Sequence, residues 1–211
     1  MSAKSFRRKT AANRGPLYIN RIRLGLIFFF LLAIVGSYDA FSPLHFRMTL
    51  GAVLLMLAYA LLQSYLLRIE RSPRYLPYLL ILLDLTMNLV VTSSGMLNST
   101  LQAAVVVRAP TLFVANFFYL IYSAFLLSPR FTLFVTAWGA VCLGAVQVIA
   151  VAMGVQYSEE SARLGTPDQL AASVEVVKIA FFVATGLIVR AVIGLLNDLN
   201  DAAVAAAEQA E

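Results

Sequence analysis

The stretch FTLFVTAWGAVCLGAVQVIAVAM, residues 131–153, decides the fold because it contains no charged side chain and no proline. It exceeds the about 20 mostly apolar residues that a helix needs to cross a bilayer. A transmembrane β-strand would instead alternate apolar and polar residues over about 10 positions, and runs such as Leu24–Val35 do not alternate. The sequence therefore predicts membrane-spanning helices.

Five further stretches of this kind lie on both sides, bounded by charged residues or proline. The whole chain of 211 residues is 61% apolar and 13% charged, against roughly 45–50% and 25% in a soluble domain. This composition excludes a soluble monomer and leaves no room for a sizeable soluble domain. We expect an all-α membrane protein, a bundle of six transmembrane helices, at Ile22–Tyr38, Phe46–Leu67, Leu76–Thr92, Val106–Leu127, Phe131–Met153 and Ser173–Leu196.

Basic residues are concentrated in segments that would all lie on one side of the membrane. The positive-inside rule places these segments, and with them both termini, in the cytoplasm. The net charge of +5 thus reflects membrane orientation, and we expect no nucleic-acid partner. Three parts follow: a basic N-terminal segment, residues 1–20; the six-helix domain, 21–196; and a juxtamembrane helix, 197–211. The basic residues expected in the cytoplasm are Lys4, Arg7, Arg8, Lys9, Arg14, Arg21, Arg23, Arg68, Arg71, Arg74 and Arg130.

Polar residues inside the predicted helices are the candidates for a binding site. Asp84 lies near the middle of the third helix, where an acidic residue costs roughly 2.5–3.5 kcal/mol to insert, so it should face protein or water. One hypothesis is a single polar pocket in the outer half of the bilayer, with the cations suited to an anionic or carbonyl-bearing ligand. The alternative is that the amides only join helices and that Glu175 pairs with Lys178 three positions away. The proposed pocket residues are Asp84, Asn88, Arg108, Asn116, Gln147 and Lys178.

The chain lacks the residue patterns of a catalytic or metal site. His45 is the single histidine and Cys142 the single cysteine, so no Cys/His metal spacing exists. There is no spaced acid pair, no glycine-rich phosphate loop, and no nucleophile with a neighbouring base. We predict no catalytic residue, no metal ligand and no built-in cofactor in this chain.

The C-terminal segment predicts a helix that continues beyond the membrane. No glycine or proline follows Leu196, so nothing stops the sixth helix. The spacing of Val192, Leu195, Leu199, Ala202 and Ala206 matches a coiled-coil seam, which would make the protein a homodimer. The alternative is a solvated tail. A helix that runs to the last residue also leads us to expect a cytoplasmic effector domain after Glu211.

This layout resembles the six-helix membrane anchors of bacterial class III adenylate cyclases, and also those of some sensor histidine kinases. The segment Ser94-Gly95-Met96-Leu97-Asn98-Ser99 is similar to the Gly-Gly-x-x-Asn-Pro-Phe loop of quinone-responsive redox kinases. It departs from that loop because Ser94 replaces the first glycine, and Ser99 and Thr100 replace proline and phenylalanine. The resemblance implies that Gly95 and Asn98 contact a lipid-like or quinone-like ligand; a simple turn is the alternative.

The resemblance further implies a receptor-like sensor in the bacterial inner membrane that anchors, dimerises and modulates an adenylate cyclase in cAMP signalling. A histidine-kinase membrane domain is one alternative, and a small transporter or channel subunit built around Asp84 is another. Transporters often have paired helices broken by glycine or proline. Because Pro110 and Pro129 lie near predicted helix ends, the sequence favours the sensor.

Overall fold

The computed structural model describes residues 3–36, 42–69, 73, 75–158 and 169–209, and it confirms the all-α class. Two strands of two residues each, β1 and β2, pair in parallel between α6 and α8. The elements are α1 (Ala3–Gly36), α2 (Pro43–Arg68), α3 (Leu76–Met96), α4 (Thr100–Arg108), α5 (Pro110–Ala124), α6 (Pro129–Ala152), β1 (Gln156–Tyr157), β2 (Gln169–Leu170) and α8 (Ala172–Gln209).

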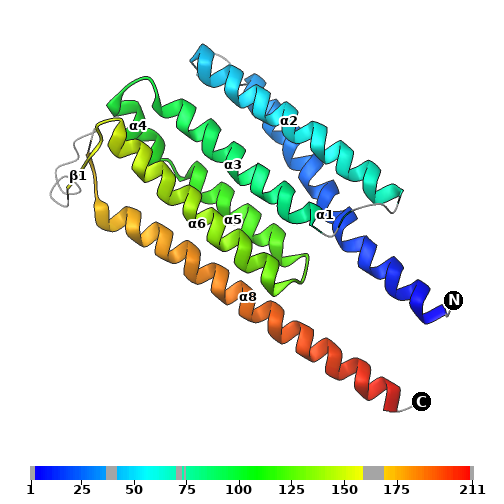
Figure 1. Ribbon diagram of the computed structural model, residues 1–211. Helices are drawn as coiled ribbons and strands as arrows, with labels where there is room; N and C mark the ends of the chain where they lie inside the picture. The colour runs from blue at the N-terminus through cyan, green and yellow to red at the C-terminus, as the bar shows by residue number, and fades with distance from the viewer. Residues whose placement is uncertain (1–2, 37–41, 70–72, 74, 159–168, 210–211) are drawn as a thin grey trace.

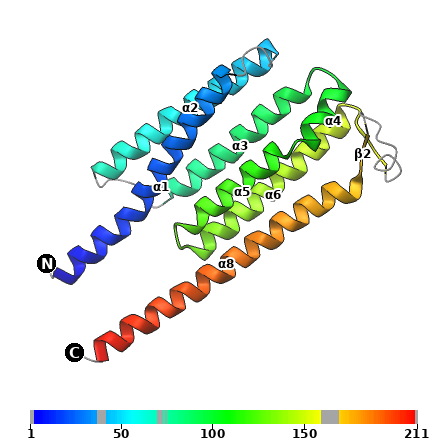
Figure 2. The ribbon, with the colours of Figure 1, turned by 180° about the vertical axis from the view of Figure 1, so that it is seen from behind.

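The helices form one bundle with α1 and α2 on one side and α8 on the other (Figures 1 and 2). Helix α3 packs between α2 and α6, and α8 lies along α6 and α5. The N-terminal end of α1 and the C-terminal end of α8 lie at the same end of the bundle (Figure 1). The C-terminal ends of α1, α3 and α6 therefore lie at the opposite end, which we call the distal end.

Five helical segments of the described chain are long and apolar enough to cross a membrane, as expected of a multi-pass membrane protein. They are α2, α3, the pair α4–α5, α6 and α8. Helix α1 is not in this set. Its uninterrupted apolar run within the described residues, Leu24 to Gly36, extends about 20 Å at 1.5 Å per residue.

The fourth predicted helix, Val106–Leu127, differs from the structure in both its start and its continuity. The hydroxyl of Ser99 accepts a hydrogen bond from the Gln102 amide at 3.1 Å, so α4 begins at Thr100. The span is then interrupted at Ala109, because Pro110 has no N–H with which to continue the helix. Pro110 thus begins α5, so it lies at a helix end as predicted, but this end lies inside the candidate span Thr100–Ala124 and not at its edge.

Two other helix ends lie beyond their predicted positions. Helix α3 continues from Thr92 to Met96, so Ser94 and Gly95 belong to a helix and not to a loop. Helix α8 continues without interruption to Gln209, which confirms the expectation of a helix that runs past Leu196.

Close packing of α6 against α8 depends on two glycines. A Cβ atom at Gly139 of α6 would lie 2.7 Å from the buried ring of Phe182 on α8. A Cβ atom at Gly186 of α8 would overlap the side chain of Thr136 on α6. The two helices therefore meet with no spare room.

Candidate functional site

A buried ion pair joins α1 to α3. The guanidinium of Arg23 donates to the carboxylate of Asp84, whose side chain is 1% exposed. The hydroxyl of Tyr59 on α2 donates to the other carboxylate oxygen. Asp84 therefore faces protein, as expected, but its partner Arg23 was expected among the cytoplasmic residues. The pairing corrects that assignment: Arg23 is buried, and its charge is compensated inside the bundle.

Further polar contacts hold Arg23 in place. Its Nη1 atom donates to the amide oxygen of Gln63 at 3.0 Å. The guanidinium carbon lies 5.3 Å from the ring centroid of Tyr59 and 5.7 Å from that of Tyr122, within the range of cation–π attraction. One turn earlier, the amide of Asn20 donates to the Ala60 carbonyl at 3.0 Å. Asn20 and Arg23 thus connect α1 to both α2 and α3 through side-chain hydrogen bonds.

A cavity of about 400 Å³ extends from this ion pair toward the distal end of the bundle. Its walls come from α1, α2, α3 and α5 and are mostly apolar, and its volume lies in the range of small-molecule sites. The polar side chains that line it are Arg23, His45, Thr49, Asp84, Asn88, Tyr119 and Tyr122.

His45 forms the polar part of the cavity wall near the distal end. Its Nδ1 atom lies 2.8 Å from the hydroxyl of Ser94, and that hydroxyl donates its own hydrogen to the Val91 carbonyl. The tautomer with its hydrogen on Nδ1 lets His45 donate to Ser94 while Ser94 donates to Val91, and in that tautomer Nε2 is an acceptor. A Cβ atom at Gly95 would lie 3.3 Å from this ring. The missing side chain at Gly95 gives the imidazole its room.

Asn88 supplies the polar group in the middle of the cavity wall. It lies one turn beyond Asp84 on α3, about 6 Å along the helix. Its amide nitrogen is buried and has no hydrogen-bond partner in the described chain. A buried N–H group without a partner is costly, so this atom calls for an acceptor that the protein does not provide.

The structure divides the predicted pocket residues into two groups. Asp84 and Asn88 line the cavity, whereas Gln147 and Lys178 belong to a second cluster around Glu175. Lys178 pairs with Glu175 at 2.7 Å, which confirms the local pairing. The expected single pocket is corrected to two separate sites. Side chains on different helices can lie at the same depth in the membrane and still point in different directions.

The second cluster connects α6, α8 and the segment between them. The amide nitrogen of Gln147 donates to Glu175 at 3.0 Å, and the hydroxyl of Tyr157 donates to the Gln147 amide oxygen at 2.5 Å. Burial raises the pKa of Tyr157 to about 12, and the nearby charge of Glu175 adds to this. Tyr157 had not been considered as a site residue, and no local pattern pairs it with Gln147.

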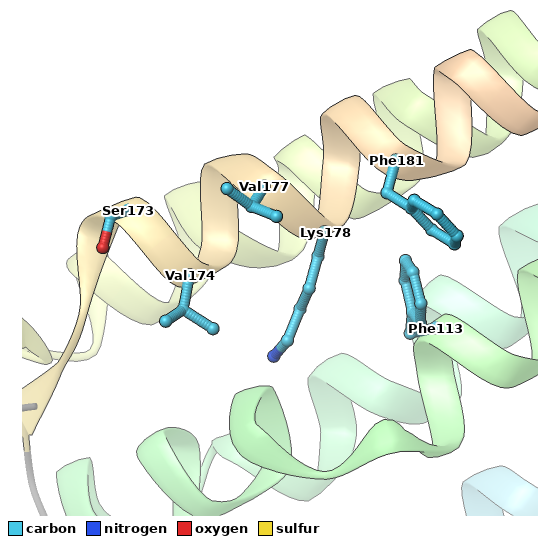
Figure 3. A pocket seen from close by; sticks show the side chains of 6 residues that line it. All are labelled: Phe113, Ser173, Val174, Val177, Lys178 and Phe181. Atoms are coloured by element: carbon cyan, nitrogen blue, oxygen red, sulfur yellow. The ribbon is translucent and has the colours of Figure 1, made fainter.

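Lys178 also borders a shallow apolar depression between α8 and α5, shown in Figure 3. Phe113 and Phe181 face each other across it. The Lys178 ammonium points toward α4, where it lies 3.4 Å from the carbonyl of Val107. That carbonyl is in the last turn of α4, where helix carbonyls lack helical partners. With Glu175 beside it, Lys178 is already compensated.

The remaining predicted residues lie outside the cavity wall. Asn116 of α5 is fully buried next to Gly139 of α6, and Arg108 is exposed at the end of α4. Asn98 is exposed in the turn between α3 and α4. Among the described residues only Leu127 and Gly154 have positive φ angles. Gly95 and Asn98 therefore do not have the left-handed backbone conformations that glycine and asparagine often supply in a simple turn.

Helix α5 connects the cavity with α8. Phe118 and Tyr119 line the cavity from one side of α5. On another side, the ring of Phe117 lies 5.5 Å from that of Phe182 and 5.9 Å from that of Phe181, measured between centroids. A displacement of α5 by a molecule in the cavity would therefore reach α8 through direct ring contacts.

Comparisons with protein-family models, curated proteins and solved structures find no match to this chain. The resemblance to cyclase anchors accordingly stays a proposal, and the function is inferred from the geometry of the molecule.

Proposed function

We propose that this protein is a receptor-like membrane sensor. In this proposal it crosses the bacterial inner membrane six times, binds a lipid-like or quinone-like molecule in the cavity, and passes the change through α8 to a cytoplasmic effector. The effector we propose is an adenylate cyclase that makes cAMP, in line with the layout of the chain.

The observation that carries this proposal is the length of α8. Its 38 residues extend about 57 Å, whereas about 30 Å suffice to cross the hydrocarbon core. The amide of Asn197 donates to the Leu127 carbonyl at 3.2 Å. Beyond it every described side chain from Asp198 to Ala207 is exposed. A rigid rod that leaves the bundle is suited to carry a rotation or shift to another domain.

The uncovered end of α8 also supports a parallel homodimer. Val192, Leu195 and Leu199 are all exposed apolar residues, and they share the seam spacing with two alanines, Ala202 and Ala206. Small alanines make a coiled-coil contact weak, as an element with two packing states requires. We propose that two copies of α8 meet along this seam.

Six crossings require α1 to span the membrane, and its polar contacts support this. The charge of Arg23, which would otherwise oppose insertion, is paired with Asp84.

The orientation is testable with single cysteines in a Cys142→Ser background. An impermeant thiol reagent added to intact cells should label Asn98→Cys at the distal end and leave Asp201→Cys unlabelled. Labelling of Asp201→Cys alone would show that the protein has the opposite orientation.

The test of signalling places a cyclase catalytic domain after residue 211 and follows cAMP. Two residues inserted after Asn200 should turn the seam by about 200° and change basal activity. Seven inserted residues should roughly restore the phase, and with it the activity. Equal activity in the fusion without an insertion and in both insertion variants would show that α8 acts as a flexible tether, and it would overturn the sensor proposal.

A transporter or channel subunit is the second candidate, and the break at Ala109–Pro110 is the observation that favours it. Interrupted helices in membranes line binding sites and pathways. The protein in liposomes should then conduct ions or move a solute, and Asp84→Asn should alter that flux. If the liposomes stay impermeable to ions and solutes and Asp84→Asn changes nothing, the sensor is the better explanation.

A further inference from the structure

The charges that line the cavity exclude a charged occupant. Of the described residues in its wall, only Arg23 and Asp84 carry a formal charge, and they pair with each other. Tyr59 and Gln63 provide further hydrogen bonds to the pair. A net charge brought into this apolar space would lack a counter-charge and would pay its full desolvation cost. The occupant is therefore neutral.

The cavity wall includes exposed apolar side chains of α1 and α5, and we infer that its mouth opens between these two helices toward the bilayer. Phe30 of α1 is 41% exposed and Phe118 of α5 is 51% exposed, and both line the cavity. Helix α1 packs mainly against α2, and it meets α5 at the ring of Tyr122, at the level of the ion pair. A molecule dissolved in the lipid phase can enter sideways at the mouth.

The amide nitrogen of Asn88 defines the chemistry of the occupant. It is a buried donor in the cavity wall without an acceptor among the described residues. A hydroxyl or carbonyl oxygen would satisfy it. The surroundings of Asn88 are apolar on the side of the mouth, where Met87 and Phe118 also line the cavity.

We propose that the cavity binds a neutral, membrane-dissolved molecule with an apolar chain and a hydroxyl or carbonyl oxygen that accepts a hydrogen bond from Asn88. The chain extends toward Phe30 and Phe118. This inference rests on the proposed function for its biological purpose and narrows the class of ligand that the sensor detects.

The test uses the full chain in vesicles of neutral phospholipid and four photoreactive diazirine probes with a dodecyl chain. The probes end in a hydroxyl, a methyl ketone, a carboxylate or a methyl group. The hydroxyl or ketone probe should label peptides of α1 and α5 saturably, with competition by unlabelled dodecan-1-ol or dodecan-2-one. Comparing these two probes shows which kind of oxygen is preferred. Equal saturable labelling by the carboxylate or alkane probe would overturn the proposal.

The variant that tests Asn88 is Asn88→Leu. Saturable labelling should weaken about fivefold, the effect of one net hydrogen bond. The unfolding temperature should not fall, because the amide nitrogen has no protein partner to lose. Thr86→Val is the matched control, since the Thr86 hydroxyl donates to the Leu82 carbonyl of its own helix and Thr86 is not among the described residues that line the cavity. Unchanged labelling in Asn88→Leu would refute the assignment.

A second variant covers the case in which Asn88→Leu fails to fold. Ala115→Phe adds a ring to the cavity wall on α5 and should abolish saturable labelling by occupying the space. Persistent labelling would place the probes elsewhere. The probes report binding without any effector, whereas the α8 insertions report signalling without any added ligand. Failure of the ligand class and failure of the sensor are therefore distinguishable.

Discussion

The two sides of the bundle are held together by different forces. On the α1–α2 side, an apolar cluster joins the two helices, and the buried ion pair between Arg23 and Asp84 lies next to it beside a cavity. On the α6–α8 side, Gly139 and Gly186 let the helices meet so closely that a Cβ atom at either position would overlap the neighbouring helix. A polar contact fixes two helices at one point and leaves room next to it. Close steric packing fixes them along their length.

The largest effect is expected from breaking the ion pair. Asp84→Leu leaves Arg23 buried without a counter-charge, which should destabilise the fold by about 3–5 kcal/mol. The double variant Arg23→Met with Asp84→Leu should recover most of that loss, because no uncompensated charge remains. Unfolding of the purified protein in detergent, followed across a double-mutant cycle, measures both. A double variant as unstable as the single would contradict the pairing.

A smaller loss is expected from filling the α6–α8 contact. Gly186→Val should cost about 1–3 kcal/mol, since the added side chain overlaps Thr136. Gly194→Val in the same helix is the matched control, because a Cβ atom there meets nothing within 4 Å. Thermal unfolding in detergent should separate the two variants. Equal melting temperatures would show that the two helices can move apart freely.

The smallest effect is expected at the distal end, from Tyr157. Its pKa of about 12 lies above the usual value of 10 because burial disfavours the charged phenolate. The folded state then holds its proton more tightly than the unfolded state. This contribution to stability is complete below about pH 10 and is lost as the pH rises toward about 12. Tyr157→Phe should show a weaker decline in melting temperature over that interval, and parallel declines would argue against the shift.

Features that depend on one segment were predictable from the sequence. The apolar runs gave five of the six expected spans, and the spacing of Glu175 and Lys178 gave their ion pair. The break at Pro110 was missed because the prediction began the fourth helix at Val106, where the apolar run begins. The span begins earlier, at Thr100. The capping serine, Ser99, was the local signal that places this start.

Features that depend on several helices were not predictable in the same way. Arg23 was counted with the cytoplasmic basic residues because orientation rules count charges near helix ends. Its pairing with Asp84 and Tyr59 depends on how three helices are rotated against one another. The usable signal was the short apolar stretch after Arg23, which is too short to span the membrane unless Arg23 itself lies within it. The cavity likewise depends on four helices.

The short apolar part of α1 has a consequence for the surrounding lipid. Its described part covers about 20 Å of a hydrocarbon core of about 30 Å, so the thickness of the membrane decides how many of the polar turns around Arg23 lie within the bilayer. Mismatch costs a fraction of a kcal/mol for each ångström, and this cost changes with the lipid composition of the membrane. The bond between Arg23 and Asp84 holds α1 at one depth against that force. The thickness of the membrane thereby acts on the same helix that borders the mouth of the cavity.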